Sequence, residues 1–151
     1  MTQLTATRVN FENAFKKHYE CYKTFSQDAH KRPKRLLLVY AVENGLKCLL
    51  LKKTCQKDSD GLQQHSDYKK NMGRDGHDIK GMLKWLGTGG LFCIRIFKAV
   101  NKHEQNVESY LLHQFWRYGL NTKDVSAEED VERTLSLIAD WIHCKLNDNL
   151  R

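Results

Sequence analysis

Apolar residues recur at helical spacing in five segments of this chain, with polar residues between them. The spacing predicts long helices over residues 8–27, 33–53, 91–118 and 126–147, and a short helix over residues 77–87. We find no segment in which apolar and polar residues alternate convincingly, as they do in a half-buried strand. The pattern therefore predicts an all-α fold, with four main helices and one short helix packed as a bundle.

The predicted helices differ in the width of their apolar face. Residues 33–53 are apolar around most of the helix circumference, which is typical of a helix at the centre of its bundle. The other long helices carry narrower stripes, of which Phe11, Phe15, Tyr19 and Tyr22 in residues 8–27 are an example. In residues 91–118 the predicted stripe extends from Phe92 to Phe115, and Ser126 with Glu129 forms a capping box at the start of the last helix.

Residues 54–76 are polar, contain glycines and keep no sustained period, so they are predicted to form a long loop. The length of 151 residues favours a single domain spanning the chain. No apolar run approaches the roughly 18 residues that a membrane span needs. The first residues also lack a basic segment followed by an apolar one, so we expect no secretory signal, no membrane association and a cytoplasmic location.

The net charge of +7 is unevenly distributed. Residues 1–56 contain eleven Lys and Arg against four Asp and Glu, whereas residues 106–151 contain five against eight. A basic surface favours an anionic partner such as RNA, although a mixed, basic surface on a protein without such a partner gives the same count.

The densest basic run is HKRPKR, residues 30–35. Such a cluster can contact phosphates, and a solvated turn between two helices is the alternative. The predicted nucleic-acid contacts are Lys31, Arg32, Lys34 and Arg35, together with Lys16 and Lys17.

The sequence predicts no metal site and no cofactor. Its histidines show no H-x-x-x-H spacing, its five cysteines no C-x-x-C spacing, and no phosphate-binding glycine loop is present. The odd number of cysteines favours reduced thiols, mostly packed as small hydrophobic residues.

Glu43 and Lys47 are the unusual charges within the apolar segment 33–53. An acid four residues before a base is the favourable order on a helix, so the pair can simply form a narrow strip facing solvent. Periodicity alone does not separate this interpretation from a functional one.

Three sequence elements in this order resemble the HEPN family of small helical domains. The first is the A-x-E-x-x-L-K pattern of Ala41, Glu43, Leu46 and Lys47. The second is the triplet of His77, Asp78 and Ile79, and the third is Arg117 with Tyr118. In addition, the segment 126–146 is similar in character to the last helix of the family. The resemblance covers about residues 8–147.

The resemblance implies an up-and-down helical bundle that is often a homodimer. It also implies that five residues support the cleft between the helices: Glu43, Lys47, His77, Asp78 and Tyr118.

Many HEPN domains are metal-independent ribonucleases with an R-x4–6-H motif, in which a histidine can move a proton and an arginine can hold phosphate charge. This sequence lacks that motif. It has the reversed order in His113 and Arg117, which share a helix face at i, i+4. His103 and Tyr110 would extend the same strip, so all four are the predicted catalytic candidates. The alternative is that Arg117 pairs with an acid such as Glu43.

Two functional hypotheses follow. The first is a HEPN-like RNA-associated protein, either an RNA binder or a divergent metal-independent ribonuclease, in a bacterial defence or toxin–antitoxin setting. The second is a non-catalytic HEPN-like module for dimerisation or protein interaction, for example the partner of a nucleotidyltransferase-like protein. A small-molecule site between the helices is a third possibility, for which the sequence specifies no ligand.

Overall fold

A computed structural model describes residues 4–25, 31–72, 76–88 and 90–148. The described part is mostly helical, so the predicted all-α class is confirmed at that level. In chain order the elements are α1 (Arg8–Thr24), α2 (Lys31–Thr54), α3 (Ser59–Gln64), α4 (Tyr68–Met72), α5 (Ile79–Trp85), β1 (Phe97–Lys98), β2 (Asn106–Val107), the 3-10 helix η1 (Ser109–Leu111), α6 (Leu112–Arg117) and α7 (Val125–Asp148). No helix within these ranges has both the length and the apolar character that crossing a membrane requires.

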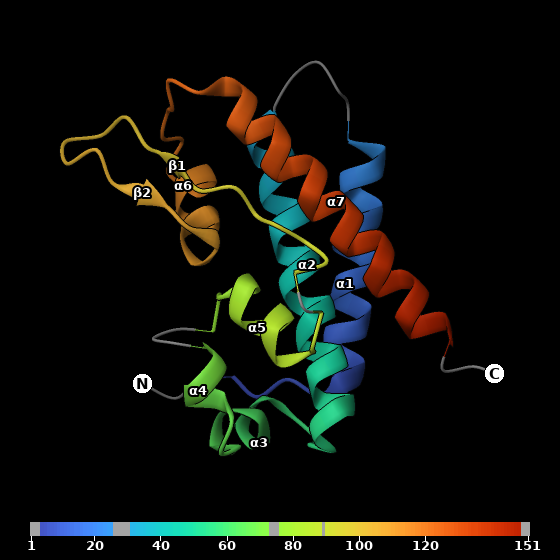
Figure 1. Ribbon diagram of the computed structural model, residues 1–151. Helices are drawn as coiled ribbons and strands as arrows, with labels where there is room; N and C mark the ends of the chain where they lie inside the picture. Colours follow the sequence, from blue (N-terminus) through green and yellow to red (C-terminus); the bar gives the residue numbers. More distant parts are fainter. Residues whose placement is uncertain (1–3, 26–30, 73–75, 89, 149–151) are drawn as a thin grey trace.

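Three long helices, α1, α2 and α7, pack side by side, and the shorter elements lie on the other side of α2 (Figure 1). The prediction that α2 is central is confirmed, because it contacts α1, α3, α5, α6 and α7. Gly45 allows the close approach of its neighbours: a β-carbon there would lie 2.7 Å from Cγ2 of Ile142 on α7 and 3.0 Å from the ring of Phe15 on α1.

The ends of the long helices agree with the sequence to within a few residues. Thr7 and Asn10 form a capping box at the start of α1, whose predicted end at residue 27 lies outside the described residues. At the start of α7 the predicted Ser126–Glu129 capping box is wrong. Asp124 caps this helix instead, accepting the backbone N–H of Ala127 at 3.1 Å and the Ser126 hydroxyl at 2.6 Å.

The predicted loop 54–76 contains two short helices, α3 and α4. Asp58 caps α3 by accepting the N–H of Gly61 at 3.0 Å. Leu62 on α3 and Met72 on α4 are buried in the core. The prediction failed because each helix is shorter than the window that reveals a helical period.

The predicted long helix over residues 91–118 is wrong. This segment forms an antiparallel pair of short strands, with Phe97 opposite Val107, followed by η1 and α6. Phe97 and Ala99 are buried whereas Lys98 and Val100 are exposed, as expected of side chains that point to opposite faces of an extended segment.

Candidate active site

Three elements that are distant in sequence bring one acid and two histidines together. Glu43 comes from the middle of α2, His77 lies just before α5, and His113 lies on α6. Glu43 and His113 are each 4% exposed. The side chain of His77 is 40% exposed, so two members of the cluster are buried and the third is accessible.

The three side chains are in direct contact. His77 Nδ1 lies 3.0 Å from Glu43 Oε2, within hydrogen-bond distance. The rings of His77 and His113 stack with centroids 4.0 Å apart and planes inclined by 23°. The other carboxylate oxygen, Glu43 Oε1, is buried and has no hydrogen-bond partner among the residues that the structure describes. A buried carboxylate with an unused oxygen is costly, and such groups call for an explanation.

The start of α5 is held by Asp78 and Ser109. Asp78 caps the helix by accepting the N–H of Gly81 at 3.0 Å. The Ser109 hydroxyl accepts the N–H of Lys80 at 3.2 Å and lies 3.4 Å from Asp78 Oδ1, as a donor. Because η1 leads directly into α6, these contacts fix the position of His113 relative to His77.

Gly81 is required by close packing in the same place. A β-carbon at Gly81 would lie 2.1 Å from the carbonyl oxygen of Asn71, which is backbone and cannot move aside cheaply. Neither Gly81 nor Ser109 was among the residues predicted from the sequence. The D-x-x-G spacing of Asp78 and Gly81 at the start of the helix could have indicated Gly81, whereas no motif in the sequence indicates Ser109.

The cluster has the chemistry of an oriented base. When His77 is neutral and donates its Nδ1–H to Glu43, Nε2 is left as a proton acceptor. A buried carboxylate behind an imidazole fixes its tautomer and stabilises its protonated form. The same carboxylate and imidazoles are also metal-ligand types, and their donor atoms lie within 4.8 Å of one another.

The structure places the cleft-support candidates unevenly. Glu43 is buried against His77, so the interpretation of a solvent-facing Glu43 is wrong, and its imidazole partner replaces the suggested pairing with Arg117. Lys47 is half-buried, with Nζ 5.9 Å from the ring centre of Phe11. Tyr118 is 64% exposed, next to the cluster-bearing helix rather than within the cluster.

The predicted strip of four catalytic candidates does not form, because it required a continuous helix from residue 103 to residue 117. His103 is exposed in the turn between β1 and β2, and Tyr110 lies in η1. Only His113 and Arg117 keep their i, i+4 relation, at the two ends of α6. Arg117 is exposed, with its guanidinium 5.3 Å from the ring centre of Tyr118.

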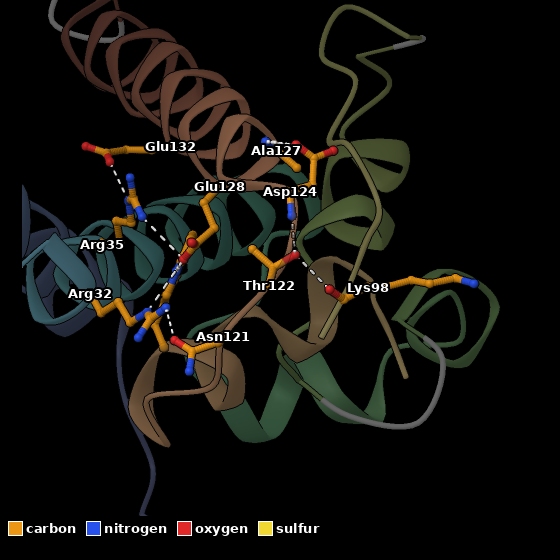
Figure 2. A network of polar contacts seen from close by, with 10 residues as sticks. Arg32, Arg35, Lys98, Asn121, Thr122, Asp124, Ala127, Glu128 and Glu132 are labelled. Carbon is orange, nitrogen blue, oxygen red and sulfur yellow. Dashed lines mark hydrogen bonds and ion pairs between the residues drawn. The ribbon is translucent and has the colours of Figure 1, made fainter. Parts of the chain in front are cut away.

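Arg32 and Arg35 of the basic run at the start of α2 belong to a second polar cluster, shown in Figure 2. Arg35 is 4% exposed and ion-paired with Glu132 at 2.6 Å and Glu128 at 3.3 Å. Arg32 donates to Asn121 Oδ1 at 2.7 Å and lies 3.7 Å from Glu128. Arg35 is therefore not available to a phosphate in this conformation, which corrects its predicted role.

The remaining predicted RNA contacts are more accessible. Lys31 and Lys17 are exposed, and exposed Lys16 lies 3.7 Å from Glu12. Lys34 is half-buried, with Nζ 4.8 Å from the ring centre of Tyr22. His30, which begins the run, lies outside the described residues.

The Arg35 cluster is closed by donors from two further helices. Trp116 Nε1 on α6 donates to Glu128 at 2.9 Å, and the Tyr22 hydroxyl on α1 donates to Glu132 at 2.7 Å. Burial works against ionisation of Glu132, but the hydrogen bonds from Arg35 and Tyr22 hold its pKa below the usual value. Nearby, burial and a hydrogen bond to Asp140 raise the pKa of Tyr19 to about 12. Glu128 and Glu132 were not among the residues predicted from the sequence, because nothing in the last helix distinguishes them from its other acidic residues.

The cysteines follow the prediction in part. Cys48 is buried, and burial raises the pKa of its thiol. The other four are exposed free thiols, so the prediction that most are packed inside is wrong; they are Cys21, Cys55, Cys93 and Cys144.

Comparison of the sequence with protein-family models, with curated proteins and with solved structures found no match in any of the three.

Proposed function

We propose that this protein is a HEPN-like RNA-associated protein that cleaves RNA without a metal ion, with His77 as the general base. One observation carries the proposal: the buried carboxylate of Glu43 lies 3.0 Å behind a 40% exposed imidazole. His77 takes the base role that the sequence had suggested for His113, because His113 is buried and stacked behind it.

The proposed reaction uses the 2′-hydroxyl of the RNA. His77 Nε2 takes the 2′-hydroxyl proton, and the 2′-oxygen attacks the adjacent phosphorus. The bond from phosphorus to the 5′-oxygen breaks, and that oxygen takes a proton from water. The imidazolium of His77 then gives its proton to the hydroxide that remains, which regenerates the base. The products are a 2′,3′-cyclic phosphate and a 5′-hydroxyl. Glu43 stabilises the imidazolium that forms, and Arg117, one helical turn beyond His113, is the candidate for holding phosphate charge.

Two features support an RNA substrate. The net charge of +7 favours an anionic partner. The sequence elements that carry the HEPN resemblance also lie near one another. Glu43 and His77 contact His113 on α6, and α6 ends with Arg117, followed by Tyr118. We also propose that the helices form a HEPN-like bundle and that the protein is a homodimer. It would have a protein partner and act in bacterial defence or in a toxin–antitoxin pair.

The test is incubation of the purified protein with labelled tRNA and total RNA in excess chelator. We expect cleavage by the wild type and a loss of about 10²–10⁴-fold in His77→Gln. His143→Gln is the matched control, since His143 is exposed on α7 and lies 3.1 Å from the side-chain nitrogen of Asn147, one turn further along the same helix. No cleavage by the wild type, or equal rates for wild type and His77→Gln, would contradict the proposal.

A non-catalytic module for dimerisation is the second candidate. It is favoured by an apolar hollow of about 570 Å³ beside α5, lined in part by Leu83, Phe92 and Ile94. Leu91, 62% exposed, lies next to this hollow in sequence. This candidate predicts no RNA cleavage and a weaker dimer in Leu91→Asp, measured by sedimentation.

A further inference from the structure

We propose that Glu43, His77 and His113 form a binding site for a divalent transition-metal ion of the zinc class. The three side chains supply one carboxylate and two imidazoles from three different elements. The sequence did not predict this site, because the three residues are 34 and 36 positions apart and match no local ligand spacing.

The distances suit a single ion. Zinc binds imidazole nitrogen and carboxylate oxygen at about 2.0–2.2 Å. Two such ligands at a right angle are therefore about 3.0 Å apart, and His77 Nδ1 and Glu43 Oε2 are separated by 3.0 Å. All three donor atoms lie within 4.8 Å of one another. Ligands on opposite sides of an ion are about 4.2 Å apart, so only a small inward shift is needed.

The second carboxylate oxygen provides independent support. Glu43 is 4% exposed, and its Oε1 makes no hydrogen bond within the described part of the chain. An uncompensated buried carboxylate is unfavourable. When His77 is neutral, it does not balance the negative charge of the Glu43 carboxylate, and a bound cation would do so.

The donor types and exposure define the class of ion. Imidazole suits zinc, nickel, copper and iron, whereas magnesium and calcium prefer oxygen ligands throughout. Three protein ligands with one open position are typical of zinc sites that bind water or a substrate. The open position here would face the exposed side of His77.

This inference uses the side chains of the proposed ribonuclease but does not depend on RNA cleavage. A bound ion would occupy His77 Nδ1 in place of the hydrogen bond to Glu43, and its positive charge would oppose protonation of Nε2, so we expect zinc to inhibit cleavage. Zinc binding without cleavage in chelator would support this site and reject the proposed function. Cleavage in chelator without zinc binding would do the reverse.

The experiment is calorimetric titration of the chelator-treated full chain with zinc chloride, without RNA. Its exposed cysteines are first alkylated, because four accessible thiols would otherwise bind zinc. We expect one ion per chain. The affinity should be at least about tenfold lower in Glu43→Gln and in His77→Gln, because a tenfold loss is already common when only a hydrogen-bond partner of a metal ligand is changed.

Glu20→Gln and His143→Gln are the matched controls, since both residues are exposed and lie on other helices. Circular dichroism of each variant checks that it is folded. Absence of zinc binding by the alkylated wild type, or binding of equal strength by folded Glu43→Gln and His77→Gln, would overturn the inference.

Discussion

Two polar clusters lie about two turns apart on α2, and they differ in how completely their charges are satisfied. Arg35 is buried between Glu128 and Glu132, and each of these acids also accepts a hydrogen bond from a Trp or Tyr on another helix. Glu43 is equally buried, but one of its oxygens is unused and its partner His77 is accessible. The first cluster joins α1, α2, α6 and α7, whereas the second presents the imidazole of His77 at the surface.

The comparison shows how a buried charge can be interpreted. A buried network in which every member is satisfied stabilises one arrangement of helices. A buried acid that is only partly satisfied is tolerated where it holds another group ready for chemistry. We therefore assign a structural role to the Arg35 cluster and a functional role to the Glu43 cluster, and the following predictions test that division.

The largest expected effect is on the proposed activity. Glu43→Gln keeps the size of the side chain but removes the charge that orients His77 and stabilises its protonated form. We expect RNA cleavage in chelator to fall by about 10²–10⁴-fold. The free energy of unfolding in urea should change by no more than about 1 kcal/mol, because the amide can still accept a hydrogen bond. A large loss of stability with unchanged cleavage would reverse the assignment.

The next effect is on stability. Arg35→Met leaves two acids without their shared cation, and breaking a buried ion pair typically costs about 3–5 kcal/mol. We expect a loss of this size in the free energy of unfolding, measured in urea. Lys31→Met is the control, because Lys31 is exposed on the same helix. A loss below about 1 kcal/mol for Arg35→Met would show that the cluster does not hold the helices together.

A smaller effect on the free energy of unfolding is expected where Gly81 on α5 packs against Asn71. Gly81→Ala brings a methyl group against the Asn71 carbonyl, and overpacking of this kind costs about 1–3 kcal/mol. It should also displace His77 and slow cleavage. Gly61→Ala is the control, since the nearest atom to a β-carbon there is Oε1 at the flexible end of the Gln56 side chain, at 2.6 Å. Equal unfolding free energies for the two variants would mean that the contact at Gly81 is easily relieved.

The smallest effect is a dependence of stability on pH. The pKa of Glu132 is lower in the folded protein than in the unfolded chain, so its contribution is present above its ordinary value of about 4.3. The contribution is lost as the pH falls below that value, through the folded pKa. Urea unfolding at pH 7 and at pH 3 should therefore show a smaller drop in Glu132→Gln than in the wild type. Glu20→Gln should retain the drop of the wild type, and an unchanged drop in Glu132→Gln would contradict the prediction.

The sequence predicted those parts of the fold in which a helical period continues over several turns. The bounds of α1, α2 and α7, and the central position of α2, follow from their apolar stripes. Residues 91–118 misled us because Phe97 and Val107 belong to strands of two residues each, too short to show a period of two.

The candidate site could be predicted only in part. Glu43 was conspicuous as a charge in an apolar helix, and His77 and His113 were named through the HEPN resemblance. Their contact depends on how α5 and α6 pack against α2, which no spacing in the sequence encodes. The burial of Arg35 was missed for the same reason, since its partners lie about a hundred residues away on α7.

The most direct test of the central claim is analysis of the RNA ends produced in excess chelator. If His77 acts as the base toward the 2′-hydroxyl, the wild type should leave 2′,3′-cyclic phosphate and 5′-hydroxyl ends, and His77→Gln should leave almost none. RNA left intact by the wild type, ends carrying a 3′-hydroxyl and a 5′-phosphate, or equal amounts of cyclic phosphate from both proteins would contradict the claim.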